Sequence, residues 1–216
     1  MPHETVSFAV DGLLLDCDGV LVDSHDAAAV AWNQWAKRWA PGFDFHRDIE
    51  HGRRIEDLVA ELIDDTSDVA TAVTELTEHE LACATDVAAI PGARELVDSL
   101  PAGGWAVVTS GGRALASARM ASAGLPTPGI LVAAEDVEHG KPYPDPYLLA
   151  AHRLGLPAAG CAVFEDAPAG VQAARAAGVG TVIGVGAAAG TDVTVTVADL
   201  RGVRFDGRRL DIEPLA

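Results

Sequence analysis

The chain has 216 residues, 49% of them hydrophobic, so it can bury a substantial core and disorder is not expected. Its 32 acidic residues outnumber the 15 basic ones, and the formal net charge of -17 excludes nucleic acid and anionic membranes as partners, because both would repel the chain. It contains no run of 18 apolar residues and no signal-peptide pattern, so we expect a soluble, cytoplasmic protein.

The first predicted strand ends in two carboxylates. The apolar run Leu13–Leu15 leads into Asp16 and Asp18, one residue apart, and then into Gly19. A buried parallel strand delivers acidic groups to the carboxyl edge of a sheet in this way. Two carboxylates so close repel each other unless a cation lies between them, and Mg²⁺ is the hard cation that takes such oxygens. From this stretch alone, an Asp-Gly turn with Asp16 as a cap stays open.

Residues 24–90 predict a helical block without strands, bounded at its far end by Pro91-Gly92. Its predicted helices cover residues 25–39, 55–63 and 69–84. The first of these carries tryptophans on one face, at i, i+3 and i+7, which we interpret as core packing: Trp32, Trp35 and Trp39.

Strands and helices alternate after residue 91. The predicted strands are 105–109, 130–133, 161–164 and 181–186, and the predicted helices are 93–100, 113–123, 146–154 and 169–177. Such repeats predict a parallel sheet with helices on both faces, whose active edge lies at the carboxyl ends of the strands. Residues 193–197 alternate, and 203–210 predict a hairpin on an Asp-Gly turn, which we expect to form an edge of the sheet.

Two of the later segments favour phosphate binding. The strand 105–109 runs into Ser110-Gly111-Gly112, whose hydroxyl and amides at a helix start could bind an anion, although a plain turn with a capping serine stays open. Lys141 precedes three prolines within five residues. It is one of only two lysines among 15 basic residues, the other being Lys37. We therefore expect its ammonium to contact a specific group, and a phosphoryl group suits it. The alternative is an exposed lysine in a turn.

The strand 161–164 ends in Glu165-Asp166, again at the predicted active edge, and these carboxylates could complete a metal site or simply cap a helix. The three cysteines lack CxxC spacing and are odd in number, so the sequence suggests neither a zinc site nor a disulfide framework. They are Cys17, Cys83 and Cys161.

The four stretches together resemble the haloacid dehalogenase-like hydrolase superfamily. DCDGVLVDS, VVTSG, HGKPYPDPY and FEDAPAG are similar to its four motifs and span nearly the whole chain. The resemblance implies an α/β fold, a doubly wound Rossmann-like parallel sheet core with an inserted small α-helical cap. The core would comprise residues 1–23 and 91–216, and the cap residues 24–90.

The resemblance also implies a role for each motif residue. Asp16 would be the nucleophile that forms an aspartyl-phosphate, and Asp18 the general acid/base and a metal ligand through its backbone carbonyl. Ser110, Gly111 and Lys141 would bind the phosphoryl group. The Mg²⁺ ligands would be Asp16, Asp18, Glu165 and Asp166.

Within the superfamily the chain is similar to sugar- and polyol-phosphate phosphatases, such as those acting on 2-deoxyglucose 6-phosphate and glycerol phosphate. The segment His51-Gly-Arg-Arg54 and the string FEDAPAG carry this similarity. The implied activity is Mg²⁺-dependent hydrolysis of a small phosphorylated metabolite. We expect the cap to select the substrate through His51, Gly52 and Arg54, with Arg54 as the foremost polar contact.

Four alternative activities fit the sequence less well. A β-phosphoglucomutase needs a cap histidine and a cap arginine where this chain has Ala28 and Ile55. A dehalogenase would lack Asp18, and a phosphonatase needs a cap lysine, for which Lys37 is poorly placed. A phospho-aspartate signalling receiver would have no cap over its site and no Asp18 to activate water. The oligomeric state stays open between a monomer and a weak homodimer.

Overall fold

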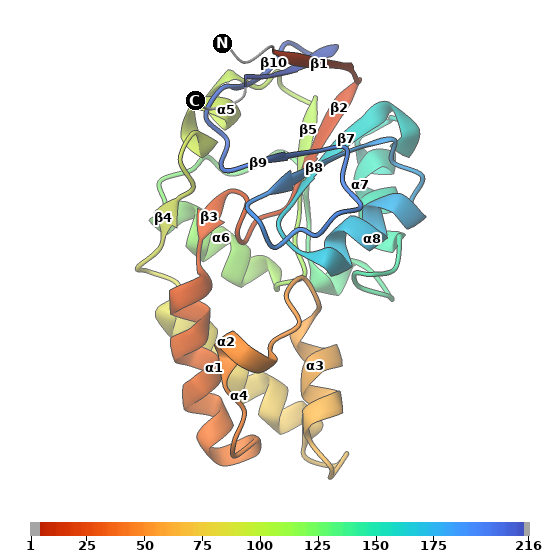
Figure 1. The fold of residues 1–216 in the computed structure, drawn as a ribbon. Helices are drawn as coiled ribbons and strands as arrows, with labels where there is room; N and C mark the ends of the chain where they lie inside the picture. The colour runs from red at the N-terminus through yellow and green to blue at the C-terminus, as the bar shows by residue number, and fades with distance from the viewer. Residues whose placement is uncertain (1–4, 214–216) are drawn as a thin grey trace.

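A six-stranded parallel sheet forms the centre of the fold (Figure 1). The structure is a computed structural model that describes residues 5–213. The strand order is β6-β5-β2-β7-β8-β9, and every neighbouring pair is parallel. The strands are β2 (Gly12–Leu15), β5 (Trp105–Val108), β6 (Leu131–Val132), β7 (Cys161–Glu165), β8 (Thr181–Val185) and β9 (Val195–Val197). The predicted doubly wound α/β fold is confirmed.

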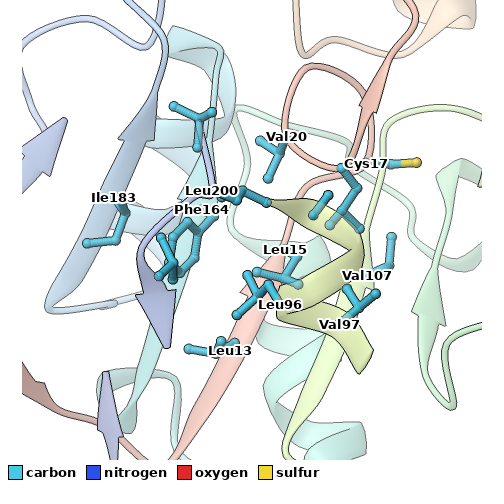
Figure 2. Close-up of a cluster of buried hydrophobic side chains, with 14 of the residues drawn as sticks. Leu13, Leu15, Cys17, Val20, Leu96, Val97, Val107, Phe164, Ile183 and Leu200 are labelled. Atoms are coloured by element: carbon cyan, nitrogen blue, oxygen red, sulfur yellow. The ribbon is translucent and has the colours of Figure 1, made fainter. Parts of the chain in front are cut away.

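Helices cover both faces of this sheet because the side chains of each strand alternate in direction. Leu13 and Leu15 of β2 pack with Leu96 of one helical layer (Figure 2), whereas Leu14 packs with Tyr147 of the other. Each fully buried leucine contributes about 1.5–3 kcal/mol to folding. The first layer contains α5 (Ala93–Ser99) and α6 (Arg113–Ser122), and the second contains α7 (Asp145–Leu154) and α8 (Pro168–Ala176).

Four further helices lie beyond the carboxyl edge of the sheet and form the helical block, α1–α4 (Figure 1). They are α1 (His25–Trp39), α2 (Phe45–Asp48), α3 (Ile55–Leu62) and α4 (Val69–Cys83). The block has its own apolar cluster around Trp32, Trp35 and Leu76, with Trp39 packed against it, so the predicted core role of the tryptophans is confirmed. The domain boundaries at residues 24 and 90 stay a prediction.

Two short strands join the helical block to the sheet. β3 (Val22–Asp23) pairs antiparallel with β4 (Ala88–Ala89), at the two points where the chain leaves and returns. The prediction that residues 24–90 contain no strand was therefore wrong at Ala88–Ala89. A two-residue strand is too short to show alternation, and its partner is remote in sequence, so no local pattern marks it.

The tail divides between two sheets. β9 is the predicted edge of the main sheet, but the hairpin of β10 (Val203–Phe205) and β11 (Arg209–Ile212) pairs instead with β1 (Val6–Ala9) in a separate antiparallel sheet. The hairpin is confirmed, and its place at the edge of the main sheet was wrong. Two 3₁₀ turns complete the fold, Ala134–Asp136 and Ala158–Gly160. Among residues 5–213, no helix is long and apolar enough to cross a membrane.

Candidate active site

Three carboxylates meet where β2 and β7 end. These neighbouring parallel strands end at the same edge, so Asp16 lies beside Glu165 and Asp166. Carboxylate oxygens of the three residues lie within 4.8 Å of one another. Gly19 allows the loop after β2 to pass over this cluster, because a Cβ there would lie 2.0 Å from Asp166 Oδ2. The structure therefore brings together acidic residues from the first and last motifs.

Lys141 lies behind this cluster, and the alternative of an exposed lysine is excluded because only 1% of the residue is exposed. Its Nζ donates to Asp16 Oδ1 and Glu165 Oε1, both at 2.5 Å, and to the Val108 carbonyl at 3.1 Å. Burial alone would lower the pKa of the ammonium, but Asp16 and Glu165 outweigh it and raise the pKa above its ordinary value. Lys141 is therefore a permanent cation in the site.

Glu165 is held rigidly from two sides. The Tyr147 hydroxyl of α7 also donates to Glu165 Oε1, and both residues are fully buried. Helix α8 approaches so closely that a Cβ at Gly170 would lie 1.8 Å from Glu165 Oε1. Tyr147 was not predicted from the sequence, although it ends the HGKPYPDPY motif. Together these contacts fix Oε1, while Oε2 accepts from the Ala167 amide at 3.4 Å.

The charges of the cluster fit a metal ion. Burial, together with the neighbouring Glu165 carboxylate, raises the pKa of Asp166 to about 8, even though Lys141 opposes the shift. Burial also raises the pKa of Asp16 well above its ordinary value, against the effect of Lys141. A hard cation among these oxygens would keep both acids ionised. Asp16, Glu165 and Asp166 could therefore hold a metal ion.

Asp18 faces the same edge with a less buried side chain, 31% exposed. Its Oδ1 accepts hydrogen bonds from Ser24 Oγ at 2.6 Å and from Arg119 Nη1 at 2.9 Å. Ser24 precedes α1, and Arg119 lies on α6 with only 4% of its residue surface exposed. Both contacts end on Oδ1, which leaves Oδ2 without a side-chain hydrogen bond among residues 5–213. Neither partner was predicted: Ser24 ends the DCDGVLVDS motif but was given no role, and Arg119 lies outside the four motifs.

An inner cavity of about 110 Å³ opens between the sheet edge and the helical block. The core contributes predicted site residues to its lining, namely Asp16, Asp18, Ser110, Gly111 and Asp166. The helical block contributes His51, Gly52 and Arg53. An outer cavity of about 800 Å³ shares His25, His51, Arg53 and Asp166 with it. These predicted core residues thus face His51 and Gly52 across the inner cavity, whereas Lys141, Glu165 and Arg54 are not part of its lining within residues 5–213.

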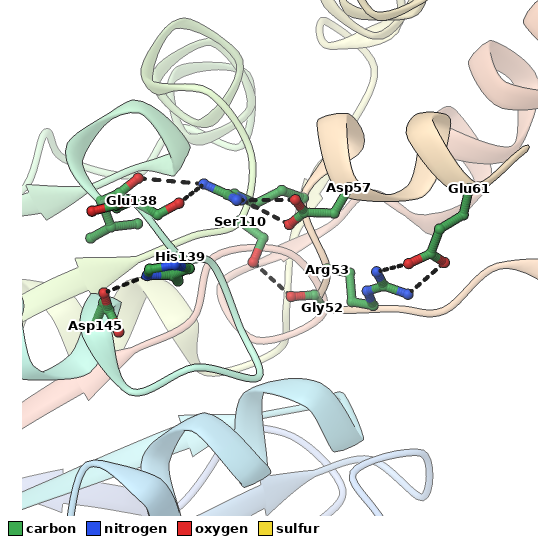
Figure 3. Close-up of polar contacts among 10 residues, drawn as sticks. Gly52, Arg53, Asp57, Glu61, Ser110, Glu138, His139 and Asp145 are labelled. Carbon is green, nitrogen blue, oxygen red and sulfur yellow. Dashed lines mark hydrogen bonds and ion pairs between the residues drawn. The ribbon is translucent and has the colours of Figure 1, made fainter. Parts of the chain in front are cut away.

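The loop before α3 touches the sheet edge directly. Ser110 Oγ donates to the Gly52 carbonyl at 2.6 Å (Figure 3). Gly52 has φ +83° and approaches the core so closely that a Cβ there would lie 2.9 Å from Ala167 Cβ. The His51 ring packs edge-on against Phe45, with centroids 5.4 Å apart. Ser110, predicted to bind phosphate, therefore also holds the helical block in place.

Comparisons with known proteins agree with this geometry. Residues 10–178 match the model of the haloacid dehalogenase-like hydrolases. The chain belongs to the haloacid dehalogenase-like hydrolase family. It is 42% identical over 184 residues to hexitol phosphatase A of Escherichia coli, covering 83% of this chain and 85% of that protein. It is 34% identical over 185 residues to glycerol-1-phosphate phosphohydrolase 2 of Saccharomyces cerevisiae, covering 80% and 74%.

The fold agrees as well. A crystal structure of a hydrolase from Pseudomonas syringae superposes with a TM-score of 0.77 at 25% identity, covering 88% of this chain and 94% of that one. The resemblance predicted from the four motifs is confirmed, and this chain is an enzyme of the hydrolase class.

The two adjacent arginines of this hydrolase have different surroundings. Arg53 lines both cavities and pairs with Glu61 at 2.6 Å (Figure 3). Arg54 instead pairs with Asp57 at 2.9 Å and donates to the Glu138 carbonyl at 3.0 Å. Within residues 5–213, Arg54 is not part of the lining of either cavity. Its predicted contact with substrate stays a prediction, and its observed contacts favour a role in fastening the loop to the core.

The variant Arg54→Ala separates these two roles. Because the observed contacts join loop to loop, we expect kcat/KM to fall by about tenfold on a sugar phosphate and on p-nitrophenyl phosphate alike. Arg47→Ala is the matched control, since Arg47 forms an exposed ion pair with Asp48 elsewhere in the helical block. A loss confined to the sugar phosphate would instead identify Arg54 as a substrate contact.

Proposed function

We propose that this hydrolase is a Mg²⁺-dependent phosphomonoesterase that hydrolyses a small sugar or polyol phosphate through an aspartyl-phosphate. The observation that carries the proposal is the inner cavity, in which Asp16, Asp18 and Ser110 face the loop of His51 and Gly52. The relatives named for hexitol phosphate and glycerol 1-phosphate support this substrate class. In this proposal, residues 24–90 form a cap over a core of residues 1–23 and 91–216.

In the proposed first step, a carboxylate oxygen of Asp16 attacks phosphorus and the ester P–O bond breaks. In the described part of the chain, the side-chain hydrogen bond to Asp16 ends on Oδ1, which leaves Oδ2 for the attack. Asp18 donates its proton to the departing ester oxygen, so an alcohol leaves and the phosphoryl group stays on Asp16. Ser110 and the Gly111 amide would orient the phosphoryl oxygens during the transfer, after turning from the Gly52 carbonyl and Thr109 Oγ1 to which they donate in this structure.

In the proposed second step, Asp18 takes a proton from water. The hydroxide oxygen attacks phosphorus, and the P–O bond to Asp16 breaks. Inorganic phosphate leaves, and both aspartates return to their starting state. Lys141 stabilises the carboxylate of Asp16 as it is released, because its ammonium is held 2.5 Å from Oδ1. Mg²⁺, held by Asp16, Asp166 and the backbone carbonyl of Asp18 with Glu165 assisting, would offset negative charge on the phosphoryl oxygens.

Two alternatives fit less well. Ala28 and Ile55 both line the inner cavity, so the positions that a β-phosphoglucomutase would fill with histidine and arginine present only hydrocarbon here. A signalling receiver would need a long-lived phospho-aspartate. Asp18 lines the same cavity as Asp16, which supports the proposal that it activates water and shortens that lifetime. The lifetime of the phosphoenzyme separates a receiver from a phosphatase.

The proposed function is tested by a screen of the purified protein with Mg²⁺ against a panel of phosphate monoesters. The panel should include hexitol phosphates, glycerol 1-phosphate, hexose phosphates and p-nitrophenyl phosphate. We expect release of inorganic phosphate, fastest from a sugar or polyol ester. Failure to release phosphate from any ester would overturn the proposal.

Removal of the metal is expected to abolish this activity. Excess chelator should stop turnover, and added Mg²⁺ should restore it, because the acidic cluster otherwise carries uncompensated negative charge. Ca²⁺ should support turnover poorly, since its larger and looser coordination misplaces the reacting groups. Phosphate release measured in each condition checks the prediction, and undiminished hydrolysis in chelator contradicts it.

A further inference from the structure

A buried polar network forms one wall of the inner cavity, on the side of Asp18. Arg119 of α6 donates through Nη1 to Asp18 at 2.9 Å and through Nη2 to Glu80 Oε1 of α4 at 3.4 Å. Trp32 Nε1 of α1 donates to the same Glu80 oxygen at 3.3 Å. Arg119, Glu80 and Trp32 all line the cavity. The network therefore joins the helical block to the residue proposed as general acid.

This network is not explained by stability alone. A buried ion pair rarely contributes net stability, because the cost of removing both charges from water offsets their attraction. Arg119 and Glu80 are only 4% and 5% exposed, yet Arg119 Nε is buried without a hydrogen-bond partner among residues 5–213. Both hydrogen bonds to Glu80 end on Oε1, so Oε2 has no hydrogen-bond partner among residues 5–213, and a hydroxyl in the cavity can donate to it.

We propose that Glu80 and Arg119 form a binding subsite for a hydroxyl group of the leaving alcohol, on the carbon next to the ester carbon. This inference rests on the proposed function. A hydroxyl both donates and accepts, so it can donate to Glu80 Oε2 while it accepts from an Nη–H of Arg119, since both residues line the cavity. A buried, charge-assisted pair of this kind distinguishes a hydroxyl from hydrogen at that carbon more strongly than an apolar wall does.

The position of the hydroxyl follows from the contact of Arg119 with Asp18. Nη1, which contacts Asp18, and Nη2, which contacts Glu80, belong to one rigid planar guanidinium, so a hydroxyl bound at Glu80 lies on the Asp18 side of the cavity. If Asp18 protonates the ester oxygen, the subsite lies within one or two carbons of that oxygen. A vicinal hydroxyl, as in a polyol 1-phosphate, meets this condition.

The same helices carry a matched control for the subsite. Glu75 of α4 accepts hydrogen bonds from Arg38 at 2.9 Å and from Trp39 Nε1 at 2.8 Å. It therefore has the same kinds of partner as Glu80, an arginine and a tryptophan. Within the described chain, Glu75 is not part of either cavity lining. Glu75→Gln removes the same charge from the same helix without touching the proposed subsite.

The experiment compares glycerol 1-phosphate with 3-hydroxypropyl phosphate, which differs only by lacking the middle hydroxyl. In the wild-type enzyme, kcat/KM should favour glycerol 1-phosphate by about tenfold or more. In Glu80→Gln this ratio should fall to about threefold or less, and in Glu75→Gln it should keep its wild-type value. Because both esters are measured on one preparation, the ratio does not depend on the fraction of enzyme that is folded.

An unchanged ratio in Glu80→Gln overturns the subsite, and so does an equal fall in Glu75→Gln. Wild-type enzyme that hydrolyses p-nitrophenyl phosphate but does not prefer glycerol 1-phosphate over its deoxy analogue also overturns the subsite, while the proposed phosphatase activity stands. Absence of hydrolysis with all three esters contradicts the proposed function, and the subsite with it.

Discussion

Asp16→Asn is expected to lower kcat by about a thousandfold or more while leaving the fold intact. The amide has nearly the same shape as the carboxylate, and its Oδ1 can still accept the hydrogen bond from Lys141. The amide is, however, a far poorer nucleophile, and it removes one negative charge from the acidic cluster of Asp16, Glu165 and Asp166. Steady-state phosphate release measures the loss, and circular dichroism checks the fold. Rapid acid quench with labelled substrate should trap a phosphoenzyme in wild type only.

Asp11→Asn is the control for this variant. Asp11 is exposed and immediately precedes β2, whereas Asp16 immediately follows it, so the two changes are chemically alike at opposite ends of one strand. Asp11→Asn should retain wild-type kinetics. Turnover near the wild-type rate in Asp16→Asn would contradict the assignment of Asp16 as the nucleophile.

The main sheet was predictable because each central strand is a local signal. β2 and β7 are buried apolar runs that end in carboxylates, and parallel pairing necessarily brings those ends together. β1 could not be predicted in the same way. It is largely exposed, and it pairs Val6 with Ile212 at the other end of the described chain, so its partner has no trace in the local pattern.

In the candidate site, too, local sequence patterns revealed some residues, whereas others come together only through tertiary packing. The acidic motif residues and Ser110 were found because they follow strands, and Lys141 because it is a rare lysine before three prolines. Arg119 and Glu80, by contrast, are single charges on helices that meet only through the packing of α4 against α6. No local spacing encodes that meeting. Arg53 and Arg54 are indistinguishable in sequence, and only the backbone of their loop directs one toward the cavity and the other toward the Glu138 carbonyl.

Lys141→Gln should destabilise the fold more than Asp16→Asn does. The ammonium is fully buried between Asp16 and Glu165, so its removal leaves two buried carboxylates without their cation. Breaking a buried ion pair in this way costs about 3–5 kcal/mol. Urea unfolding in the presence of chelator, with wild type and variant side by side, measures the loss. Activity should fall as well, by about a hundredfold or more, because a fixed positive charge beside the proposed nucleophile Asp16 is lost.

Added Mg²⁺ should restore part of the stability of Lys141→Gln but not its full activity, because a metal ion in the acidic cluster supplies charge without replacing the hydrogen bond to Asp16. Lys37→Gln is the matched control, since Lys37 is exposed and bonds only Gln34, at 2.7 Å, within the described residues. Its free energy of unfolding should change by about 0.5 kcal/mol at most. Equal effects of the two substitutions would show that the one buried lysine of this arginine-rich chain does not balance the acidic cluster.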